Sequence, residues 1–363
     1  MHILFAHAGL HRIHRGSEIV FEAVAQEIAA AGVHEVTVAG SGPPIAGRAY
    51  SFEHVPVIPR EKFERWPKVP YLRSEYMYED LIFSAALMLG GLASRADLTV
   101  GCAYPYTNWA LRFSRPGKPR TPHVFVTQNG DWPASQSKGE PKFFDCDGLI
   151  CTNPIYFERN LDRWRSVLIP NGVDLDRFHP GAGDRSKLGI PLHQPVVLMA
   201  SALQPGKRVE SAIRAVSSVP NAFLLIAGDG ILREEVDSLA AKLLPSRYMR
   251  KTFPHEQMPE VYRCADVFLH TTIGESFGNI YIEALSSGLP IVAHDEEVTR
   301  WILGKHALLV DTRVDDDIVN AIQSLISVSR RTTTGAVAWA RERYGWKRVA
   351  RSYLEFFETV ASK

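Results

Sequence analysis

The sequence predicts an α/β protein with two doubly wound parallel-sheet (Rossmann-like) domains, and three observations support this. Short apolar runs alternate with helical patterns nearly throughout the chain, as is typical of βαβ units with helices on both faces of a parallel sheet. A length of 363 residues favours two domains of ordinary size over one. A turn-rich stretch from Pro170 to Gly189 then separates two alternating series.

The first series opens with a strand expected at Ile3–Ala6. A helix from about Ser17 to Ala31 follows, because Val20, Val24 and Ile28 form an apolar stripe at helical spacing. The remaining strands of this series are expected at Val36–Ala39, Leu98–Val100, Val124–Thr127, Leu149–Thr152 and Val167–Ile169. In open α/β sheets ligands bind beyond the carboxyl ends of the strands, so the loops after these strands are candidate sites.

The second series follows Pro170-Asn171-Gly172-Val173-Asp174, a turn signal, and the Gly/Pro-rich stretch up to Gly189 is interpreted as a linker. Its strands are expected at Val196–Ala200, Phe223–Ala227, Val267–His270 and Ile291–Ala293. An amphipathic helix is expected from Tyr344-Gly345-Trp346 onward.

The most informative stretch runs from Glu275 to Glu283. Phe277, Ile280, Tyr281, Ala284 and Leu285 share one helical face, and Gly288 and Pro290 end that helix. This places Glu275 in the loop before the helix and Glu283 on it. Free N–H groups at a helix start suit an anion, and carboxylates accept hydrogen bonds from hydroxyls, so a nucleotide-sugar fits. The alternative is an ordinary strand-loop-helix unit with two solvated glutamates.

Two cation-rich loops are further candidates for anion binding. The loop from His7 to Glu18 contains Arg12, Arg15 and Gly16 just before a helix. A metal cluster of its histidines is disfavoured because no carboxylate or cysteine joins them at ligand spacing, and a solvated basic loop stays an alternative. In the second series Lys207 and Arg208 follow a Pro-Gly turn, where they suit the two phosphates of a leaving diphosphate or are simply exposed at a helix start.

Composition excludes several other functions. The net charge of +1 indicates no nucleic-acid partner. No apolar run is long enough to cross a bilayer, and Met1–Ala6 lacks the basic region of a signal peptide. The four cysteines show neither CxxC pairing nor metal-ligand spacing. We therefore expect a cytoplasmic protein with reduced thiols and no bound metal or cofactor.

Taken together and in order, these motifs resemble family 4 glycosyltransferases, the retaining group with the GT-B fold of two such domains facing a central cleft. The resemblance covers nearly the whole chain. It is carried by Arg15-Gly16-Ser17-Glu18, Ile169-Pro170-Asn171-Gly172-Val173-Asp174, Lys207, Gly228-Asp229-Gly230, Glu275 through Glu283, and the helix from Tyr344. It implies an acceptor-side domain of residues 1–172 plus a returning helix at 345–363, and a donor-binding domain of residues 173–344.

The resemblance also implies roles for individual residues. It makes Glu275 and Lys207 catalytic candidates, with Glu275 on the transferred sugar and Lys207 on the diphosphate. Arg208 is the third catalytic candidate, because it can replace a phosphate-binding arginine that the family has and this chain lacks. The donor-binding set implied by it is Gly16, Lys207, Arg208, Gly228, Phe277, Gly278, Asn279 and Glu283, with Glu283 on the ribose and the base near Phe253–Met258. The family pattern is not complete, because Ser201-Ala202 replaces Gly-Arg and Gln128 replaces a histidine.

The acceptor is expected on the first domain and would be a sugar, a lipid-linked sugar or a small molecule, as in polysaccharide biosynthesis. Its candidate residues are His14, Gln128, Asn129, Asp131 and Trp132. Cations and aromatics between Arg60 and Tyr78 suit a phospholipid surface or sugar rings, so peripheral contact with the inner membrane face is expected, with a solvated loop as the alternative. A nucleotide-sugar epimerase and a non-catalytic nucleotide-sugar or glycan-binding protein are the alternative functions.

Overall fold

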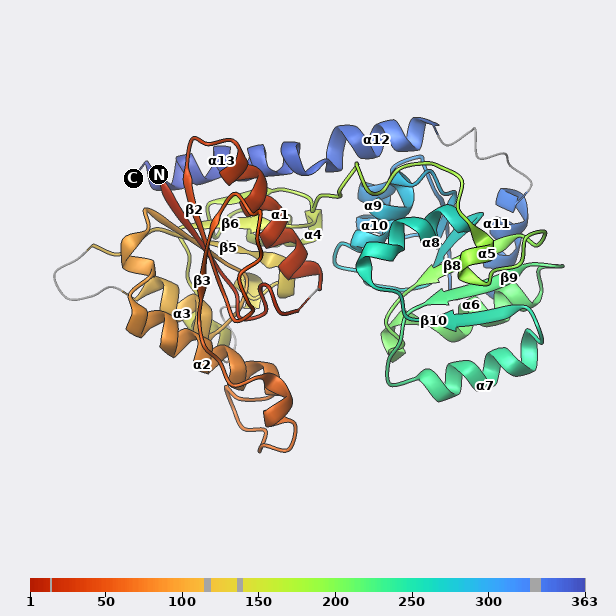
Figure 1. The fold of residues 1–363 in the computed structure, drawn as a ribbon, viewed down its shortest axis with the longest axis horizontal. Coiled ribbons are helices and arrows are strands. Elements are labelled where there is room, and N and C mark those ends of the chain that lie inside the picture. Colours follow the sequence, from red (N-terminus) through yellow and green to blue (C-terminus); the bar gives the residue numbers. More distant parts are fainter. Residues whose placement is uncertain (14, 114–118, 136–139, 327–333, 363) are drawn as a thin grey trace. The chain divides into compact units, whose positions relative to one another are not determined.

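In a computed structural model of the chain, residues 1–13, 15–113, 119–135, 140–326 and 334–362 are described. The chain divides into two compact units (Figure 1). Unit 1 comprises Met1–Asn171 and Trp346–Lys363, and unit 2 comprises Gly172–Gly345. The resemblance implies residues 1–172 plus 345–363 and residues 173–344, and each of these boundaries differs by one residue from the division into units. The acceptor-side and donor-binding roles of the two domains stay predictions.

Unit 1 contains a seven-stranded parallel sheet with the order β3-β2-β1-β4-β5-β6-β7. Its strands are β1 (His2–Ala6), β2 (Glu35–Gly40), β3 (Ser51–His54), β4 (Leu98–Gly101), β5 (His123–Val126), β6 (Gly148–Cys151) and β7 (Ser166–Leu168). Its α-helices are α1 (Gly16–Ala30), α2 (Glu75–Gly90), α3 (Tyr106–Arg112), α4 (Pro154–Asn160) and α13 (Trp346–Ala361).

The alternation of side chains along β1 explains the layers of unit 1. Ile3 and Phe5 point to one face of the sheet, where they pack in one core with α1 and α13. Leu4 and Ala6 point to the other face and pack with residues of α2 and α3. Successive strand side chains alternate between faces, so a run that is apolar throughout is buried on both. The last helix of the chain thus belongs to the core of unit 1, as Figure 1 shows beside α1.

Unit 2 contains a six-stranded parallel sheet with the order β10-β9-β8-β11-β12-β13. Its strands are β8 (Val196–Ala200), β9 (Phe223–Ala227), β10 (Tyr248–Lys251), β11 (Val267–His270), β12 (Ile291–His294) and β13 (Leu308–Val310). Its α-helices are α5 (Arg185–Leu188), α6 (Val209–Ser217), α7 (Arg233–Leu243), α8 (Met258–Cys264), α9 (Asn279–Ser286), α10 (Glu297–Leu303), α11 (Asp315–Ile326) and α12 (Thr334–Tyr344).

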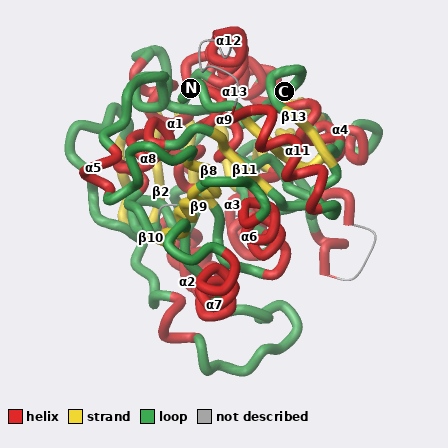
Figure 2. The backbone as a smooth tube through the Cα atoms, turned by 90° about the vertical axis from the view of Figure 1, so that its right-hand side faces the viewer, coloured by secondary structure: helices red, strands yellow, loops and turns green. Residues whose placement is uncertain are grey.

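Helices cover both faces of the unit 2 sheet. One core joins alternate residues of β8, β9 and β11 to α6, α7 and α11. Figure 2 shows α6 and α7 below these strands, with α8 and α9 above them. Both sheets therefore have the doubly wound architecture that the alternating pattern predicts.

The structure differs from the sequence prediction at three edge strands and at two boundaries. The edge strands β3, β10 and β13 are only partly buried, so they lack the continuous apolar run that reveals a central strand. The helix after Glu275 starts at Asn279, because Gly278 has a left-handed conformation that ends the preceding loop. The stretch 172–189 is not a free linker: Val173 pairs with Gly345, and α5 lies within it.

No helix in the described part of the chain is both long enough and apolar enough to span a membrane.

Candidate functional site

The first strand of each sheet lies inside it, with later strands on both sides. The chain therefore changes winding direction between β8 and β11 in unit 2, and between β1 and β4 in unit 1. Loops diverge at the carboxyl ends of such strand pairs, which is where doubly wound sheets bind ligands. In unit 2 these loops carry the lysine and the first glutamate that the sequence singles out.

Lys207 and Glu275 contact each other directly. Lys207 ends a 3-10 turn after β8, and Glu275 lies in the loop after β11. The Lys207 ammonium donates to Oε2 of Glu275 at 2.7 Å, with 28% of the lysine side chain and 13% of the glutamate side chain exposed. Residues that are 68 positions apart thus form one polar cluster that remains reachable from solvent.

His270, the last residue of β11, is the second partner of Glu275. Its Nε2 lies 3.4 Å from Oε2 of Glu275, and the imidazole is fully buried. Burial by itself raises the pKa of Glu275, but the hydrogen bond from His270 and the charge of Lys207 outweigh it and lower this pKa to about 2. Glu275 is therefore a carboxylate throughout the physiological pH range, and as such it only accepts hydrogen bonds.

The loop that carries Glu275 is held in place by hydrogen bonds from its backbone to Glu296. The carboxylate of Glu296 accepts from the N–H groups of Gly274 at 2.8 Å and of Glu275 at 3.1 Å. Gly278 has a φ of 73°, and a Cβ there would lie 2.8 Å from the Tyr281 ring, so only glycine fits. The site is thus preorganised by contacts of the protein itself.

Glu283, the second glutamate of the motif, lies on α9 with only 13% of its side chain exposed. Tyr262 donates its hydroxyl to Oε2 of Glu283 at 2.9 Å. Nε2 of His255 lies 3.7 Å from the other carboxylate oxygen. The two glutamates therefore differ in their surroundings: Glu275 pairs with a cation and an imidazole, and Glu283 with a phenol and an imidazole.

Among the other predicted donor-binding residues, Arg208 uses part of its guanidinium for hydrogen bonds within unit 2. Its Nη2 donates to Oγ of Ser211 at 3.1 Å and to the carbonyl of Thr312 at 3.3 Å. Its Nε is buried without a hydrogen-bond partner among the described residues. Arg208 thus stands beside Lys207 in the chain, but part of its guanidinium is occupied within unit 2.

Gly228 and Gly230 allow two loops of unit 2 to pack closely against each other. A Cβ at Gly228 would lie 1.9 Å from the carbonyl oxygen of Ser201, and one at Gly230 would lie 2.4 Å from that of Leu203. The absence of side chains lets the loop after β9 pack against the loop after β8. Phe277, buried just before α9, packs edge-on against Trp301 and Tyr344.

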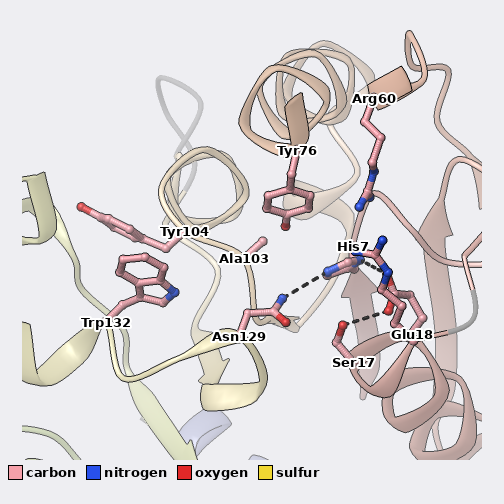
Figure 3. Close-up of a pocket in the computed structure, with 10 residues that line it drawn as sticks. His7, Ser17, Glu18, Arg60, Tyr76, Ala103, Tyr104, Asn129 and Trp132 are labelled. Atoms are coloured by element: carbon pink, nitrogen blue, oxygen red, sulfur yellow. Dashed lines mark hydrogen bonds and ion pairs between the residues drawn. The ribbon is translucent and has the colours of Figure 1, made fainter. Parts of the chain in front are cut away.

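Unit 1 carries a cavity of about 260 Å³ beside its own change of winding direction (Figure 3). The loop after β1 contributes His7, and the loop after β4 contributes Ala103 and Tyr104. Asn129 and Trp132 come from the segment after β5, and the rings of Tyr104 and Trp132 lie 5.9 Å apart at one end of the cavity. The remaining lining residues are Arg15, Ser17, Glu18, Arg60 and Tyr76.

His7 and Glu18 form the buried polar wall of this cavity. The backbone N–H of Gly9 donates to Nδ1 of His7 at 3.0 Å, so the proton of the neutral ring is on Nε2. Burial lowers the pKa of His7 and keeps it neutral. Nδ2 of Asn129 lies 3.4 Å from Nε2 (Figure 3), and because Nε2 carries the proton, a hydrogen bond here requires the amide to turn its oxygen toward the ring. Glu18, 2% exposed, accepts from the hydroxyl of Ser17 at 2.9 Å.

Arg60 and Tyr76 form the wall next to α2. Arg60 donates from Nε at 2.9 Å and from Nη2 at 2.6 Å to the fully buried carboxylate of Glu79, which also accepts from Arg12. The Arg60 guanidinium lies 5.1 Å from the centre of the Tyr76 ring. The Tyr76 hydroxyl is buried without a partner among the described residues and points toward the cavity in Figure 3.

Only some of the predicted acceptor-side residues line the cavity. Asn129 and Trp132 line the cavity. Gln128 instead exchanges hydrogen bonds with the amide of Asn171, at 2.6 and 3.3 Å. Asp131 accepts from Asn160 at 2.7 Å and so ties its loop to α4. His14 lies outside the described residues.

Gly16 and Asn279, the remaining predicted donor contacts, are the first residues of α1 and α9, respectively. Within the described part of the chain, no group of three or more His, Cys, Asp or Glu side chains is arranged to hold a metal ion.

Sequence reasoning did not identify several residues of both sites as functional. His270 is hidden at the end of an apolar strand, Glu296 caps a later helix, and Tyr104 comes from a segment far from any motif. Tyr76 lies within the stretch from Arg60 to Tyr78 that the sequence analysis named, but it was not predicted individually. The signal available for His270 is a polar residue at the carboxyl end of a buried strand, where side chains face the ligand edge of the sheet.

Comparison with known proteins gives one family match. Residues 182–334 match the model of the glycosyl transferases group 1. The lipopolysaccharide core biosynthesis glycosyltransferase LpsE of Rhizobium meliloti is 28% identical over 207 residues, which are 56% of this chain and 59% of that protein. The D-inositol 3-phosphate glycosyltransferase of Nocardia farcinica is 32% identical over 221 residues, 55% of this chain and 48% of that protein. The matches thus span about half the length of these curated relatives.

Solved structures match over nearly the entire chain. Sucrose-phosphate synthase from Thermosynechococcus elongatus aligns with a TM-score of 0.80 at 20% identity, over 99% of both chains. Anabaena HepE in complex with UDP and glucose aligns with a TM-score of 0.75 at 18% identity, over 99% of this chain and 100% of that one. At these identities the likeness shows the fold, and the predicted GT-B class with two doubly wound parallel-sheet domains is confirmed.

Proposed function

We propose that the protein is a glycosyltransferase, because residues 182–334 match the model of the glycosyl transferases group 1. It moves a sugar from a nucleoside-diphosphate sugar to a hydroxyl acceptor with retention of configuration, as in family 4. The observation that carries this proposal is the contact of Lys207 with Glu275 at the change of winding direction in unit 2, at 2.7 Å.

Lys207 suits the leaving diphosphate. Breakage of the bond between C1 and the phosphate oxygen builds negative charge on that oxygen, and a preorganised cation stabilises it. Lys207 is partly exposed and fixed on Glu275, so its ammonium is already desolvated on one side. Arg208 and the start of α9 supply further positive potential. We propose that these groups do the work without a bound metal ion, and that addition of a chelator leaves turnover unchanged.

Glu275 suits hydroxyls of the transferred sugar. Both of its protein donors, Lys207 and His270, reach the same oxygen, Oε2. The other oxygen, Oε1, can accept from a ligand. In a front-face route the departing phosphate takes the proton of the acceptor hydroxyl, so retention requires no protein base, and Glu275 positions the sugar.

Glu283 suits the ribose of the donor. Its carboxylate is fixed by Tyr262 and lies beside His255. His255 belongs to the short segment where the resemblance places the base. HepE, which has the same fold, was solved in complex with UDP-glucose, and the chemistry of this site is compatible with such a donor.

The cavity of unit 1 suits the acceptor. Tyr104 and Trp132 offer aromatic faces to a sugar ring, while Glu18 and Asn129 offer hydrogen bonds to its hydroxyls. Its volume of about 260 Å³ lies just below the range of about 300–1,000 Å³ that is typical of ligand pockets, which favours one ring over a longer segment. We propose a glycosyl acceptor, free or lipid-linked, used by a cytoplasmic enzyme at the inner membrane face.

Alanine substitution at Lys207 and at Glu275 tests the proposal. Each change is expected to lower turnover about 100-fold, because each removes a charge placed for the transition state. Product formation from UDP-, GDP-, ADP- and dTDP-sugars is followed by mass spectrometry, with Asp315→Asn, on the exposed surface of α11, as the control. Unchanged turnover in both variants would refute these roles.

Incubation of the wild type with donor alone separates the alternatives. A transferase hydrolyses the donor slowly at most, whereas an epimerase changes its sugar. Binding of the donor without transfer to any acceptor would indicate a non-catalytic binding protein.

A further inference from the structure

His270 stands out among the residues around Glu275, because its imidazole is fully buried at the end of an otherwise apolar strand. Burying a polar ring costs free energy unless it makes a hydrogen bond. Within the described part of the chain, this ring makes one hydrogen bond, from Nε2 to Oε2 of Glu275 at 3.4 Å. Nδ1 is buried without a partner among the described residues. The ring therefore faces the site through a single atom.

The direction of this hydrogen bond follows from the surroundings. Burial lowers the pKa of His270, so the ring is neutral and carries one proton. A carboxylate can only accept, so the proton is on Nε2 and His270 is the donor. The ring is fixed in place as well, since Tyr281 meets it edge-on at 5.1 Å and Phe268 lies parallel to it at 6.3 Å.

Lys207 donates to the same oxygen, Oε2 of Glu275, at 2.7 Å. The two donors differ in freedom: the lysine is 28% exposed on a flexible stem, while the histidine is fully buried. A diphosphate that approaches the loop after β8 competes for the lysine and leaves the histidine in place.

We propose that His270 is a positioning residue that holds Oε2 of Glu275 when Lys207 turns to the diphosphate of the donor. Oε1 then stays directed at a hydroxyl of the transferred sugar. This inference rests on the proposed glycosyl transfer, and it adds a fixed donor that keeps the carboxylate ionised and in one orientation while its cation is engaged elsewhere.

The other groups that face Glu275 do not replace His270 in this role. Glu296 accepts from the backbone N–H groups of Gly274 and Glu275 and is itself an anion. The hydroxyl of Tyr281, near both carboxylates, is buried and makes no hydrogen bond within the described residues. Lys207 and His270 are therefore the two groups that lower the pKa of Glu275.

Two substitutions of similar size separate the donor function from the packing function. His270→Gln retains an N–H group at about the position of Nε2, while His270→Leu fills the space without a donor. Loss of one hydrogen bond to a charged group predicts that His270→Leu lowers kcat about 10- to 100-fold. His270→Gln is expected to restore most of it. If His270→Leu melts at lower temperature, His270→Asn, whose amide is too short to reach Glu275, is the second variant without the donor.

The pH dependence and the binding of product distinguish positioning from a structural effect. Without His270 the pKa of Glu275 rises from about 2, so the acid limb of the kcat profile moves to higher pH in His270→Leu. Affinity for the nucleoside diphosphate alone, measured by calorimetry with UDP and GDP, is expected to stay within about twofold, because the ring acts on the sugar-binding carboxylate.

The outcomes are distinguishable. A lower kcat, a shifted acid limb and recovery in His270→Gln together support the inference. A kcat in His270→Leu equal to that of the wild type would overturn it while leaving the proposed function intact. A wild type that neither hydrolyses nor transfers any of the four classes of nucleotide-sugar would overturn both.

Discussion

In both units the first strand lies inside a parallel sheet, and the loops beyond it diverge at the change of winding direction. In unit 2 these loops carry charged side chains that contact one another, with Lys207 and His270 on one oxygen of Glu275. In unit 1 they surround a cavity of about 260 Å³ with aromatic rings at one end. The same topology thus supports a rigid charged cluster in one unit and an open cavity in the other.

The difference lies in how the charges are neutralised. In unit 2 the charged groups face the site and remain partly exposed. In unit 1 the carboxylate of Glu79 is fully buried behind the cavity and holds Arg12 and Arg60. We expect the first arrangement to serve binding and catalysis, and the second to support the shape of the wall. The following changes test this contrast.

Glu79→Gln is expected to have the largest effect on stability. Removing one partner of a buried ion pair leaves uncompensated charge, at a cost of about 3–5 kcal/mol. Calorimetric unfolding of the full chain measures it, with Asp315→Asn as the control because its pair with Arg214 is exposed and is expected to contribute less than about 1 kcal/mol. Equal melting temperatures of Glu79→Gln and Asp315→Asn would show that the buried ion pair does not stabilise unit 1.

The double variant Lys207→Ala with Glu275→Ala tests whether the unit 2 cluster acts as one group. Each single change is expected to lower kcat about 100-fold, or about 2.7 kcal/mol. Because the two side chains contact each other, their effects should not add, and the double variant should be close to either single one. Steady-state kinetics of all four proteins measures the coupling, and simple addition of the two effects would contradict it.

The sequence predicted the unit 2 cluster better than the unit 1 cavity, and the reason is physical. Glu275, Gly278 and Glu283 lie within nine consecutive residues, so local periodicity reveals a loop and a helix start. The cavity draws Arg60 from a 3-10 turn, Tyr76 from α2 and Tyr104 from the loop after β4, and only tertiary packing unites them. The central strands could be predicted because strands buried on both faces have continuous apolar runs. The edge strands β3, β10 and β13 are only partly buried and lack such runs.

The same limit applies inside the predicted motifs. Gln128 and Asp131 stand beside Asn129 and Trp132 in the sequence, but Asn171 and Asn160 engage their side chains within unit 1. Proximity along the chain identified the segment, and only the packing showed which of its side chains reach the cavity.

Gly228→Ala tests whether tight loop packing maintains the unit 2 site. The added Cβ would meet the carbonyl of Ser201 at 1.9 Å, and such overpacking costs about 1–3 kcal/mol. Gly206→Ala is the control, because a Cβ there would meet no atom within 4 Å. Thermal melting is expected to fall only for Gly228→Ala, and an unchanged melting temperature would mean that the loops can separate at no cost.

Trp132→Ala is expected to have the smallest effect and tests the unit 1 cavity. Losing one aromatic face should raise the KM for the acceptor about tenfold, or about 1.4 kcal/mol, with the KM for the donor unchanged. Leu89→Ala is the control, because that side chain is 85% exposed on α2. A change in the KM for the donor alone would assign the cavity to the other substrate.

Donor binding by unit 2 tests the central claim most directly. The melting temperature of the wild type and of Lys207→Ala is measured with UDP-, GDP-, ADP- and dTDP-sugars, where ligand at 100 times its dissociation constant adds about 2.7 kcal/mol. We predict that at least one donor class raises the melting temperature of the wild type and that this shift largely disappears in Lys207→Ala. No shift with any donor, or an equal shift in the variant, would contradict a nucleotide-sugar site built on Lys207 and Glu275.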